Sequence, residues 1–343
     1  MNSIRNSFQG LTVASLLGLA ICSPAAYAAD IKERTLKLPV VTAIDHPLGV
    51  GTAKFSELVE KKSGGKIKMK VYANGTLGGE VQIISAIQGG TIDASIVLPA
   101  NLAGMAREFT MLDLPYVFDD EQQAAQVLDG PVGKRLLGYL PAKGLVGLGF
   151  MESGFRNYTN SKRPISKVED FAGLKLRSLQ SPLFVDFTTA LGANPVPLAF
   201  TELYTALENK TIDGQENTYA TIQSSKFNEV QKYASETRHV YASQIVLLSA
   251  KLWNQLSADE RKIFQDAAVE AIDFQRKFAR DADLKAREAL KKLGMEMVSI
   301  TPQERQRLRD KVKAVIDKYA GQLPEDVRKE FYAELDKARK TAR

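Results

Sequence analysis

Residues 257–293 read SADERKIFQDAAVEAIDFQRKFARDADLKAREALKKL, a segment with neither glycine nor proline. Ser257 and Glu260 at its start have the spacing of a capping box, in which each side chain accepts a hydrogen bond from the other residue's backbone N–H. We therefore predict a single helix over residues 258–293, roughly 50 Å long at 1.5 Å per residue. A helix about three times the average globular length is long enough to cross more than one layer of the fold.

The chain before this helix alternates short apolar runs with amphipathic segments, a pattern typical of α/β architecture. A first series predicts strands at residues 36–43, 67–72, 92–98 and 145–151 and helices at 50–62, 80–88 and 121–140. A second series, starting near Gly154, predicts strands at 156–159, 174–177 and 212–217 and helices at 182–191 and 201–208. After the long helix, charged helices are expected at 303–319 and 324–340. The restart indicates two α/β lobes, for which 343 residues are enough.

The composition narrows the chemistry. With 44% hydrophobic and 25% charged residues, the chain is expected to fold as a globular protein. A single cysteine cannot form an intramolecular disulfide, and two histidines with one cysteine are too few for a typical structural zinc site. The nucleophile elbow, the phosphate-binding loop, the metalloprotease motif and the dinucleotide-binding glycine motif are missing. We therefore predict no metal, no cofactor and no enzymatic activity, with catalysis by a pair of carboxylates as the open alternative.

Residues 1–28 have the features of a signal peptide. Arg5 is the only charge before an apolar run at 11–22, and Ala26-Tyr27-Ala28 matches the small-residue pattern of a cleavage site. We therefore predict export to the periplasm and removal of this segment. A retained N-terminal anchor and lipid attachment at Cys22 are the alternatives.

The charge of the chain is mildly positive. A formal net charge of +6 results from 46 Lys and Arg against 40 Asp and Glu. The basic residues are interspersed with acids along the C-terminal helices, which is typical of solvated helix faces. We therefore predict no nucleic-acid partner.

The stretch Gly173-Leu-Lys-Leu-Arg177 places a cation at the end of a predicted strand. Alternation along the strand puts Lys175 and Arg177 on one face and the two leucines on the other. The carboxyl ends of strands in open α/β sheets border the ligand crevice, and a guanidinium there can bind a carboxylate through two parallel hydrogen bonds. Arg177 is therefore the candidate anchor for an organic acid. The alternative is that both cations only face solvent.

A set of short motifs extends over the remainder of the chain after the signal peptide. These motifs are His46-Pro47, Leu77-Gly78-Gly79, Gly89-Gly90, Asp113-Leu-Pro-Tyr-Val-Phe118, Thr159-Asn-Ser-Lys-Arg-Pro-Ile165, Gly192-Ala-Asn-Pro-Val-Pro197, Asp213-Gly-Gln-Glu-Asn217 and Glu229-Val-Gln-Lys-Tyr233. Together they resemble the solute-binding subunits of tripartite ATP-independent periplasmic (TRAP) transporters, of the dicarboxylate type. Each motif alone would be weak evidence for this family, but the combination of motifs is specific for it.

The resemblance implies an α/β, two-lobed periplasmic binding protein fold, in which crossing strands and the long helix join lobes that close over a small organic acid. Matched by motif, Arg177 is the carboxylate anchor, Arg156 a second cationic contact, Asn217 a polar contact and Phe200 an apolar wall. Plain core packing is the alternative for Phe200, and a helix cap is the alternative for Asn217.

The resemblance and the local sequence suggest further contacts in the first lobe. His46 lies before a helix start, where an anion could bind, and a simple surface position is the alternative. Acids that sialic-acid-binding relatives use are replaced at Gly79 and near Leu98, which favours a smaller or partly apolar ligand, with Asn101 as a polar contact.

The lobes are expected to comprise residues 29–153 with about 243–280 (lobe I) and 154–242 with about 283–343 (lobe II). Asp213 and Glu216 are expected to hold their turn, because acids would repel an anionic ligand.

The resemblance implies a monomer that delivers its ligand to the membrane subunits of a TRAP transporter. An envelope enzyme of carboxylate type and a binding protein coupled to a sensor receptor are the alternatives. C4-dicarboxylates, sugar acids, keto acids and aromatic acids all stay open as ligands.

Overall fold

The computed structural model describes residues 31–341, so the predicted signal peptide lies outside the described residues. The strands are β1 Arg34–Pro39, β2 Ile67–Tyr72, β3 Ala94–Val97, β4 Leu145–Asn160, β5 Lys175–Ser178, β6 Asn194–Pro197, β7 Gly214–Asn217, β8 Tyr233–Ser249 and β9 Glu296–Val298. The α-helices are α1 Pro47–Lys62, α2 Glu80–Gly89, α3 Glu121–Asp129, α4 Pro131–Leu137, α5 Pro182–Ala190, α6 Leu203–Glu208, α7 Tyr219–Ser224, α8 Ala250–Gln255, α9 Ala258–Lys292, α10 Pro302–Lys311, α11 Lys313–Gly321 and α12 Glu325–Thr341.

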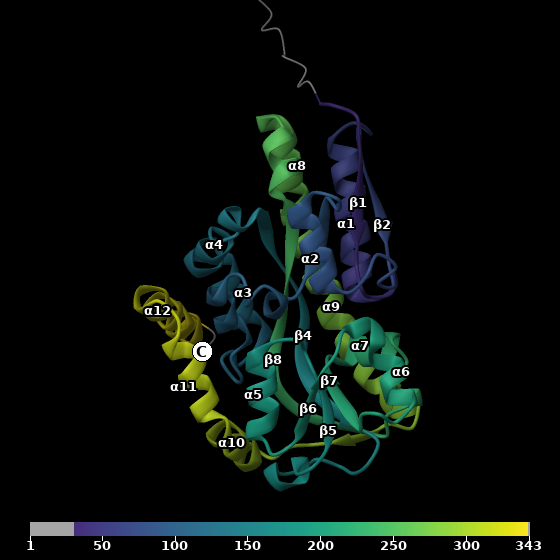
Figure 1. Cartoon of the computed structure of the whole chain (residues 1–343), viewed down its shortest axis with the longest axis vertical. Coiled ribbons are helices and arrows are strands. Elements are labelled where there is room, and N and C mark those ends of the chain that lie inside the picture. The colour runs from purple at the N-terminus through teal and green to yellow at the C-terminus, as the bar shows by residue number, and fades with distance from the viewer. Residues whose placement is uncertain (1–30, 342–343) are drawn as a thin grey trace, which may run out of the picture. The chain divides into compact units, whose positions relative to one another are not determined.

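The long strands β4 and β8 lie side by side and antiparallel (Figure 1). Near the end of β8, β3 pairs with it, and Ile96 lies opposite Val246. At the opposite end of this ribbon, β7 pairs with β4, where Tyr158 lies opposite Glu216, and β5 and β6 extend the sheet. β9 pairs with β8, while β1 and β2 form a separate parallel pair. The two long strands therefore connect the elements of the first series with those of the second.

β4 merges two predicted strands into one. The sequence predicted separate strands at 145–151 and 156–159, but β4 pairs with β8 over both segments, with a register shift between Glu152 and Gly154. Gly149 and Gly154 have φ angles of +150° and +104°, and such glycine bulges interrupt the side-chain alternation used for prediction. The predicted lobe boundary at residue 153 falls within this continuous strand.

The resemblance implied crossing strands, but the sequence pattern predicted no strand at residues 233–249, where β8 lies. It is 17 residues long and is buried along most of its length. Its buried residues include polar ones, among them Thr237, His239 and Gln244. A strand with polar residues buried among apolar ones shows no clear period-2 pattern, so the sequence contained no usable signal for it.

The long helix is confirmed as α9. In its capping box, Glu260 N donates to Ser257 Oγ at 3.1 Å, and Ser257 N donates to Glu260 Oε2 at 2.9 Å. The first half of α9 packs on α1, where the rings of Phe55 and Phe264 lie 6.3 Å apart, and the second half packs on α7. Since α1 belongs to the first series and α7 to the second, α9 spans both.

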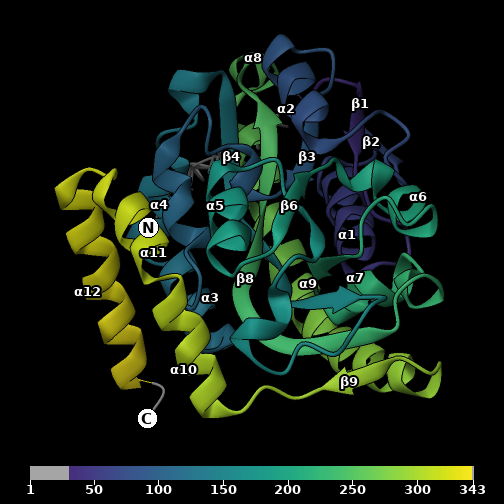
Figure 2. The same ribbon diagram turned by 60° about the horizontal axis from the view of Figure 1, so that its bottom comes forward.

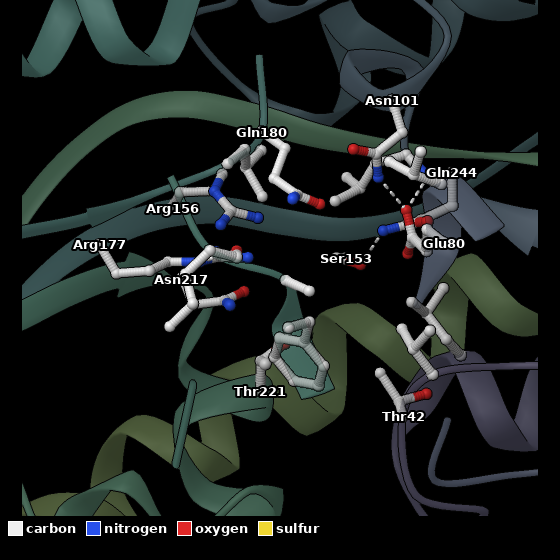
Figure 3. A pocket seen from close by; sticks show the side chains of 18 residues that line it. Thr42, Glu80, Asn101, Ser153, Arg156, Arg177, Gln180, Asn217, Thr221 and Gln244 are labelled. Atoms are coloured by element: carbon white, nitrogen blue, oxygen red, sulfur yellow. Dashed lines mark hydrogen bonds between the residues drawn. The ribbon is translucent and has the colours of Figure 1, made fainter. Parts of the chain in front are cut away.

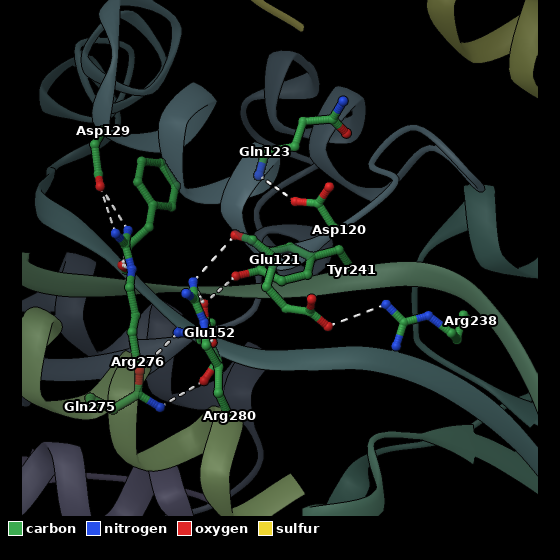
Figure 4. Close-up of polar contacts among 11 residues, drawn as sticks. Asp120, Glu121, Gln123, Asp129, Glu152, Arg238, Tyr241, Gln275, Arg276 and Arg280 are labelled. Atoms are coloured by element: carbon green, nitrogen blue, oxygen red, sulfur yellow. Dashed lines mark hydrogen bonds and ion pairs between the residues drawn. The ribbon is translucent and has the colours of Figure 1, made fainter. Parts of the chain in front are cut away.

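The middle of α9 is tied to β4 and β8 by buried polar groups (Figure 4). Gln275 Nε2 donates to the carbonyl of Glu152 at 2.6 Å, and Glu152 N donates back to Gln275 Oε1 at 3.0 Å. The Glu152 carboxylate accepts from Arg280 Nε at 2.7 Å and from the hydroxyl of Tyr241 at 2.6 Å. These contacts fix the helix against β4 at the point where the two series meet, and Tyr241 of β8 joins them through Glu152.

Two predicted helices are each divided in the structure. Residues 121–140 form α3 and α4, separated at Gly130, because Pro131 has no N–H to continue the helix and fits its first turn. Residues 303–319 fall into α10 and α11, which meet at Val312 with φ −100° and ψ 3°. The helices α10, α11 and α12 lie along one flank (Figure 2). There α12 contacts α3 and α4, and α11 contacts α5.

The apolar core is organised around the long strands. One cluster packs both series and the C-terminal helices around β4 and β8, a second joins β1, β2, α1 and the first half of α9, and a third joins α6, α7 and the end of α9. The predicted α/β class with a long spanning helix is confirmed, while the residue limits of the two lobes stay a prediction. Within residues 31–341, no helix is both long and apolar enough to cross a membrane.

Candidate functional site

A pocket lies where the two series of elements face each other (Figure 3). It encloses about 600 Å³ of space, including the part open to solvent. The lining residues are Val41, Thr42, Leu48, Glu80, Val81, Leu98, Asn101, Ser153, Arg156, Arg177, Leu179, Gln180, Leu198, Ala199, Phe200, Asn217, Thr221 and Gln244. Five of the six predicted site residues are among them, and His46 is the exception. A lining of apolar side chains with a few polar and charged groups is typical of a site for a small organic ligand.

Arg177 reaches the pocket from β5 and is 2% exposed. Its Nε donates to the carbonyl of Leu198 at 2.9 Å, but its Nη1 is buried and has no hydrogen-bond partner among the described residues. Burial lowers the pKa of Arg177 to about 10, which leaves the guanidinium charged at neutral pH. Lys175 on the same strand is exposed, so the solvent-facing alternative holds for it and not for Arg177. An acceptor, best a carboxylate, would complete the bonding of Arg177.

Arg156 also lines the pocket, but most of its hydrogen-bonding capacity is used internally. Its Nε donates to Glu216 Oε2, and its Nη2 donates to Glu216 Oε1 and to the Glu216 carbonyl, both at 2.8 Å. Burial alone would raise the pKa of Glu216, but Arg156 and His239 hold it at about 2. The pair is therefore ionised, and only Nη1 of Arg156 makes none of these bonds.

This pairing corrects one sequence prediction. Glu216 was expected to hold the turn, but it lies buried within β7 and neutralises Arg156. Asp213 does hold the turn, because its Oδ2 accepts from Lys175 N at 2.9 Å. Arg177 is therefore the cation in the pocket wall whose charge lacks an ion-pair partner among residues 31–341.

Asn217 and Phe200 both face the pocket. Asn217 ends β7, and its Oδ1 accepts from Thr218 N at 3.1 Å, which leaves its Nδ2 for a ligand. Thr218, and not Asn217, is the N-cap of α7, so the helix-cap alternative is wrong. Phe200 begins a short 3₁₀ turn, Phe200–Glu202, and packs edge-on against Phe227 with ring centroids 6.2 Å apart. It combines core packing with a place in the pocket wall.

His46 lies behind the pocket wall. Its Nδ1 accepts from Leu48 N at 3.0 Å, capping α1, and its Nε2 lies 3.1 Å from Thr221 Oγ1. The side chain is buried, and burial lowers its pKa to about 3. Both the anion-contact prediction and the surface alternative are therefore wrong for this structure. His46 connects the start of α1 to Thr221, which itself lines the pocket.

An acid was missed on the opposite wall. The resemblance indicated that Gly79 replaces an acid used by sialic-acid-binding relatives. The next residue, Glu80, begins α2 and lines the pocket. Its Oε2 accepts from Leu98 N at 3.0 Å and from Asn101 Nδ2. Burial raises the pKa of Glu80, against the opposing effect of these two donors. Asn101 therefore lines the pocket as predicted, but its amide is engaged with Glu80.

Other polar groups of the pocket belong to residues that were not predicted as site residues from the sequence. Gln244 on β8 donates through Nε2 to Ser153 Oγ on β4 at 3.2 Å. Within the described part of the chain, Gln244 Oε1 and Thr42 Oγ1 are buried without a hydrogen-bond partner, as is Arg177 Nη1. An unsatisfied buried polar group costs about 1–3 kcal/mol. Three of them in one pocket indicate a polar ligand.

The two walls approach each other closely beside the pocket residues Glu80 and Ala199. Gly75, in the loop before α2, has a φ of +62°, and a Cβ placed on it would lie 2.5 Å from Thr201 Cγ2. A Cβ on Gly79 would lie 3.6 Å from the Cβ of Ala199. The loop of the first series therefore rests on the segment of the second series that precedes α6.

Comparisons with known proteins identify the family of the chain. The model of the bacterial extracellular solute-binding proteins, family 7, matches residues 40–322. The C4-dicarboxylate-binding periplasmic protein DctP of Rhodobacter capsulatus is 33% identical over 93% of this chain and 95% of its own length.

Two solved structures are similar along nearly their whole length. The sugar acid binding protein DctPAm of Advenella mimigardefordensis, in complex with galactonate, has a TM-score of 0.88 and 42% identity, covering 90% of this chain and 100% of that one. A TRAP periplasmic solute-binding protein of Ochrobactrum anthropi, with a C-terminus bound in its ligand-binding pocket, has a TM-score of 0.81 and 46% identity, covering 91% and 98%. The resemblance to TRAP solute-binding subunits is confirmed, and the chain belongs to family 7 of the bacterial extracellular solute-binding proteins.

Proposed function

We propose that this protein captures a small organic carboxylate in the periplasm and delivers it to the membrane subunits of a TRAP transporter. The observation that carries the proposal is the buried Nη1 of Arg177, which points to no acceptor within residues 31–341 although it belongs to a charged group. A hydrogen bond to a charged group is worth about 1.5–3 kcal/mol when it is desolvated. A ligand carboxylate supplies the acceptor and the opposite charge together.

The neighbours of Arg177 support a carboxylate at this end of the pocket. Arg156 Nη1 and Asn217 Nδ2 are further donors, and Phe200 gives an apolar wall beside them. Because Glu216 already neutralises Arg156, a single carboxylate balances the charge at this end.

The relatives support the same ligand class. The Rhodobacter protein is named for C4-dicarboxylates, the Advenella protein holds galactonate, and the Ochrobactrum protein holds a C-terminus. Dicarboxylates, galactonate and a chain terminus have a carboxylate group in common.

Binding without catalysis fits the lining of the pocket. Glu80 is the one acid among the described lining residues, and hydrolysis by a carboxylate pair needs two.

We propose that residues 1–28 are removed on export and that the mature protein is a monomer with the two lobes predicted from sequence. These lobes close by bending near the α9 contacts with Glu152. The contact of Gly75 with Thr201 supports a closed arrangement.

Identification of the retained ligand tests this function. The mature protein is purified without added acids, denatured, and its small molecules are identified by mass spectrometry. A panel of organic acids is then screened by thermal unfolding, in which an acid at about a hundred times its dissociation constant adds about 2.7 kcal/mol of stability. A retained carboxylate that raises the unfolding temperature supports the proposal. A stabilising ligand without a carboxylate, or conversion of the acid into a product, would refute it.

A further inference from the structure

The two ends of the pocket differ in hydrogen-bonding character. The end formed by β4, β5 and β7 presents donors, namely Arg177 Nη1, Arg156 Nη1 and Asn217 Nδ2. The opposite end presents acceptors, with Glu80 from α2 and Gln244 from β8, as Figure 3 shows. A ligand that bridges the pocket therefore meets cations at one end and an acid at the other.

Glu80 is held in place as a hydrogen-bond acceptor. Both of its hydrogen bonds, from Leu98 N and Asn101 Nδ2, go to Oε2, so Oε1 has none of them. Glu80 is also the first residue of α2, where the partial positive charge of the helix start favours a carboxylate. The carboxylate is thereby oriented in the wall, with one oxygen left for the pocket.

Gln244 extends this acceptor surface. Its Nε2 donates to Ser153 Oγ, which leaves Oε1 buried and without a donor among the described residues. An amide oxygen and a carboxylate oxygen both accept hydrogen bonds, and neither can donate. A ligand hydroxyl can donate to both, whereas an ionised carboxylate has no proton to give.

We propose that Glu80 selects the ligand class, admitting an acid that carries hydroxyl groups at the end remote from its carboxylate and rejecting a second carboxylate there. The inference rests on the proposed function, because it takes the ligand carboxylate to be at Arg177. The ligand is then a hydroxylated monocarboxylate of the sugar-acid class. A dicarboxylate would place two like charges side by side in a partly desolvated wall, which raises their repulsion above its value in water.

A matched pair of ligands isolates this effect. Galactonate and galactarate have the same six-carbon hydroxylated chain and differ only at the far end, which is a hydroxymethyl group in the first and a carboxylate in the second. Erythronate and meso-tartrate form the equivalent four-carbon pair. Isothermal titration calorimetry gives the ratio of dissociation constants within each pair, and this ratio removes contributions that both ligands share.

For the wild-type protein and the better-binding pair, we expect the monocarboxylate to bind at least tenfold more tightly than its dicarboxylate partner. This ratio is equivalent to about 1.4 kcal/mol. In Glu80→Gln the amide keeps the shape of the side chain but loses the charge, so the ratio should fall at least fivefold. Glu60→Gln, an exposed position on α1, removes the same charge outside the pocket and should leave the ratio unchanged.

The outcomes separate the two proposals. If the diacid binds as tightly as the monoacid in the wild type, or if Glu80→Gln leaves the ratio unchanged while folding normally, the selection by Glu80 is refuted and carboxylate capture stands. If neither of these pairs nor any other carboxylate binds, the proposed function fails and the inference fails with it. The wild-type ratio does not depend on the stability of any variant.

Discussion

Arg156 and Glu216 form a buried ion pair across β4 and β7, with Arg156 Nη2 donating to Glu216 Oε1 at 2.8 Å. Their side chains are 3% and 1% exposed. This pair neutralises one of the two pocket arginines and leaves Arg177 as the one that needs a ligand. The pocket is therefore built around one balanced cation and one unbalanced cation.

Removing one partner of this pair should destabilise the protein strongly. Glu216→Gln leaves Arg156 charged and buried without its counter-charge, and such losses typically cost about 3–5 kcal/mol. Urea unfolding of the ligand-free protein measures the change. The double variant Arg156→Met with Glu216→Leu is the control, since replacing both charges should destabilise less than the single variant. A Glu216→Gln variant as stable as the wild type would contradict the ion-pair assignment.

The close approach of Gly75 to Thr201 should be sensitive to a single methyl group. Gly75→Ala places a Cβ 2.5 Å from Thr201 Cγ2, which should hinder closure and weaken ligand binding by about tenfold, or 1.4 kcal/mol. Gly65→Ala is a matched control, because Gly65 also has a positive φ, +83°, but nothing lies within 4 Å of its added Cβ. Calorimetry should show normal affinity for that control. Thr201→Ser removes the clashing methyl and should restore binding to Gly75→Ala; a failure to restore it would argue against this contact.

His46 should make the protein less stable in mild acid. Its folded pKa of about 3 lies below the unfolded value of 6.5, so the unfolded chain binds the proton first and stability falls as the pH drops from 6.5 toward 3. The contribution of His46 between pH 6 and pH 5 is about 1 kcal/mol. Urea unfolding at both pH values, compared with His46→Asn, measures it. Asparagine keeps a capping oxygen and does not titrate, so an equal pH dependence in both proteins would contradict the assignment.

The link between α9 and β4 should contribute measurably to stability. Gln275→Leu leaves the backbone N–H and carbonyl of Glu152 without their buried partners, which should lower the free energy of unfolding by about 2–4 kcal/mol. Gln303→Ala, at an exposed position on α10, should change it by less than about 0.5 kcal/mol. Denaturant unfolding of the three proteins decides between these values. Equal stability of Gln275→Leu and wild type would show that the two hydrogen bonds between Gln275 and Glu152 do not stabilise the protein.

Local features made much of the fold predictable. The capping box of Ser257 and Glu260 identified α9 with its correct start, and strand alternation identified Arg177. These signals depend on residues close together in the sequence. The strand β8 had no such signal, because Thr237, His239 and Gln244 are polar residues buried within it.

The errors in the site have a common physical origin. Glu216 was misassigned because its partner Arg156 is 60 residues away, and His46 because its partner Thr221 is 175 residues away. Glu80 was not predicted as a site residue, although it directly follows Gly79. Only the folded structure shows which distant polar groups satisfy one another and which are left for a ligand.

The affinity of Arg177→Ala for the identified acid, measured by isothermal titration calorimetry, tests the central claim most directly. We predict at least tenfold weaker binding than wild type, with Arg177→Lys between the two because lysine keeps the charge but not the planar donor pair. Arg107→Ala, at an exposed position, is the control and should bind as the wild type does. An unchanged dissociation constant in a correctly folded Arg177→Ala protein would contradict the assignment of Arg177 as the carboxylate anchor.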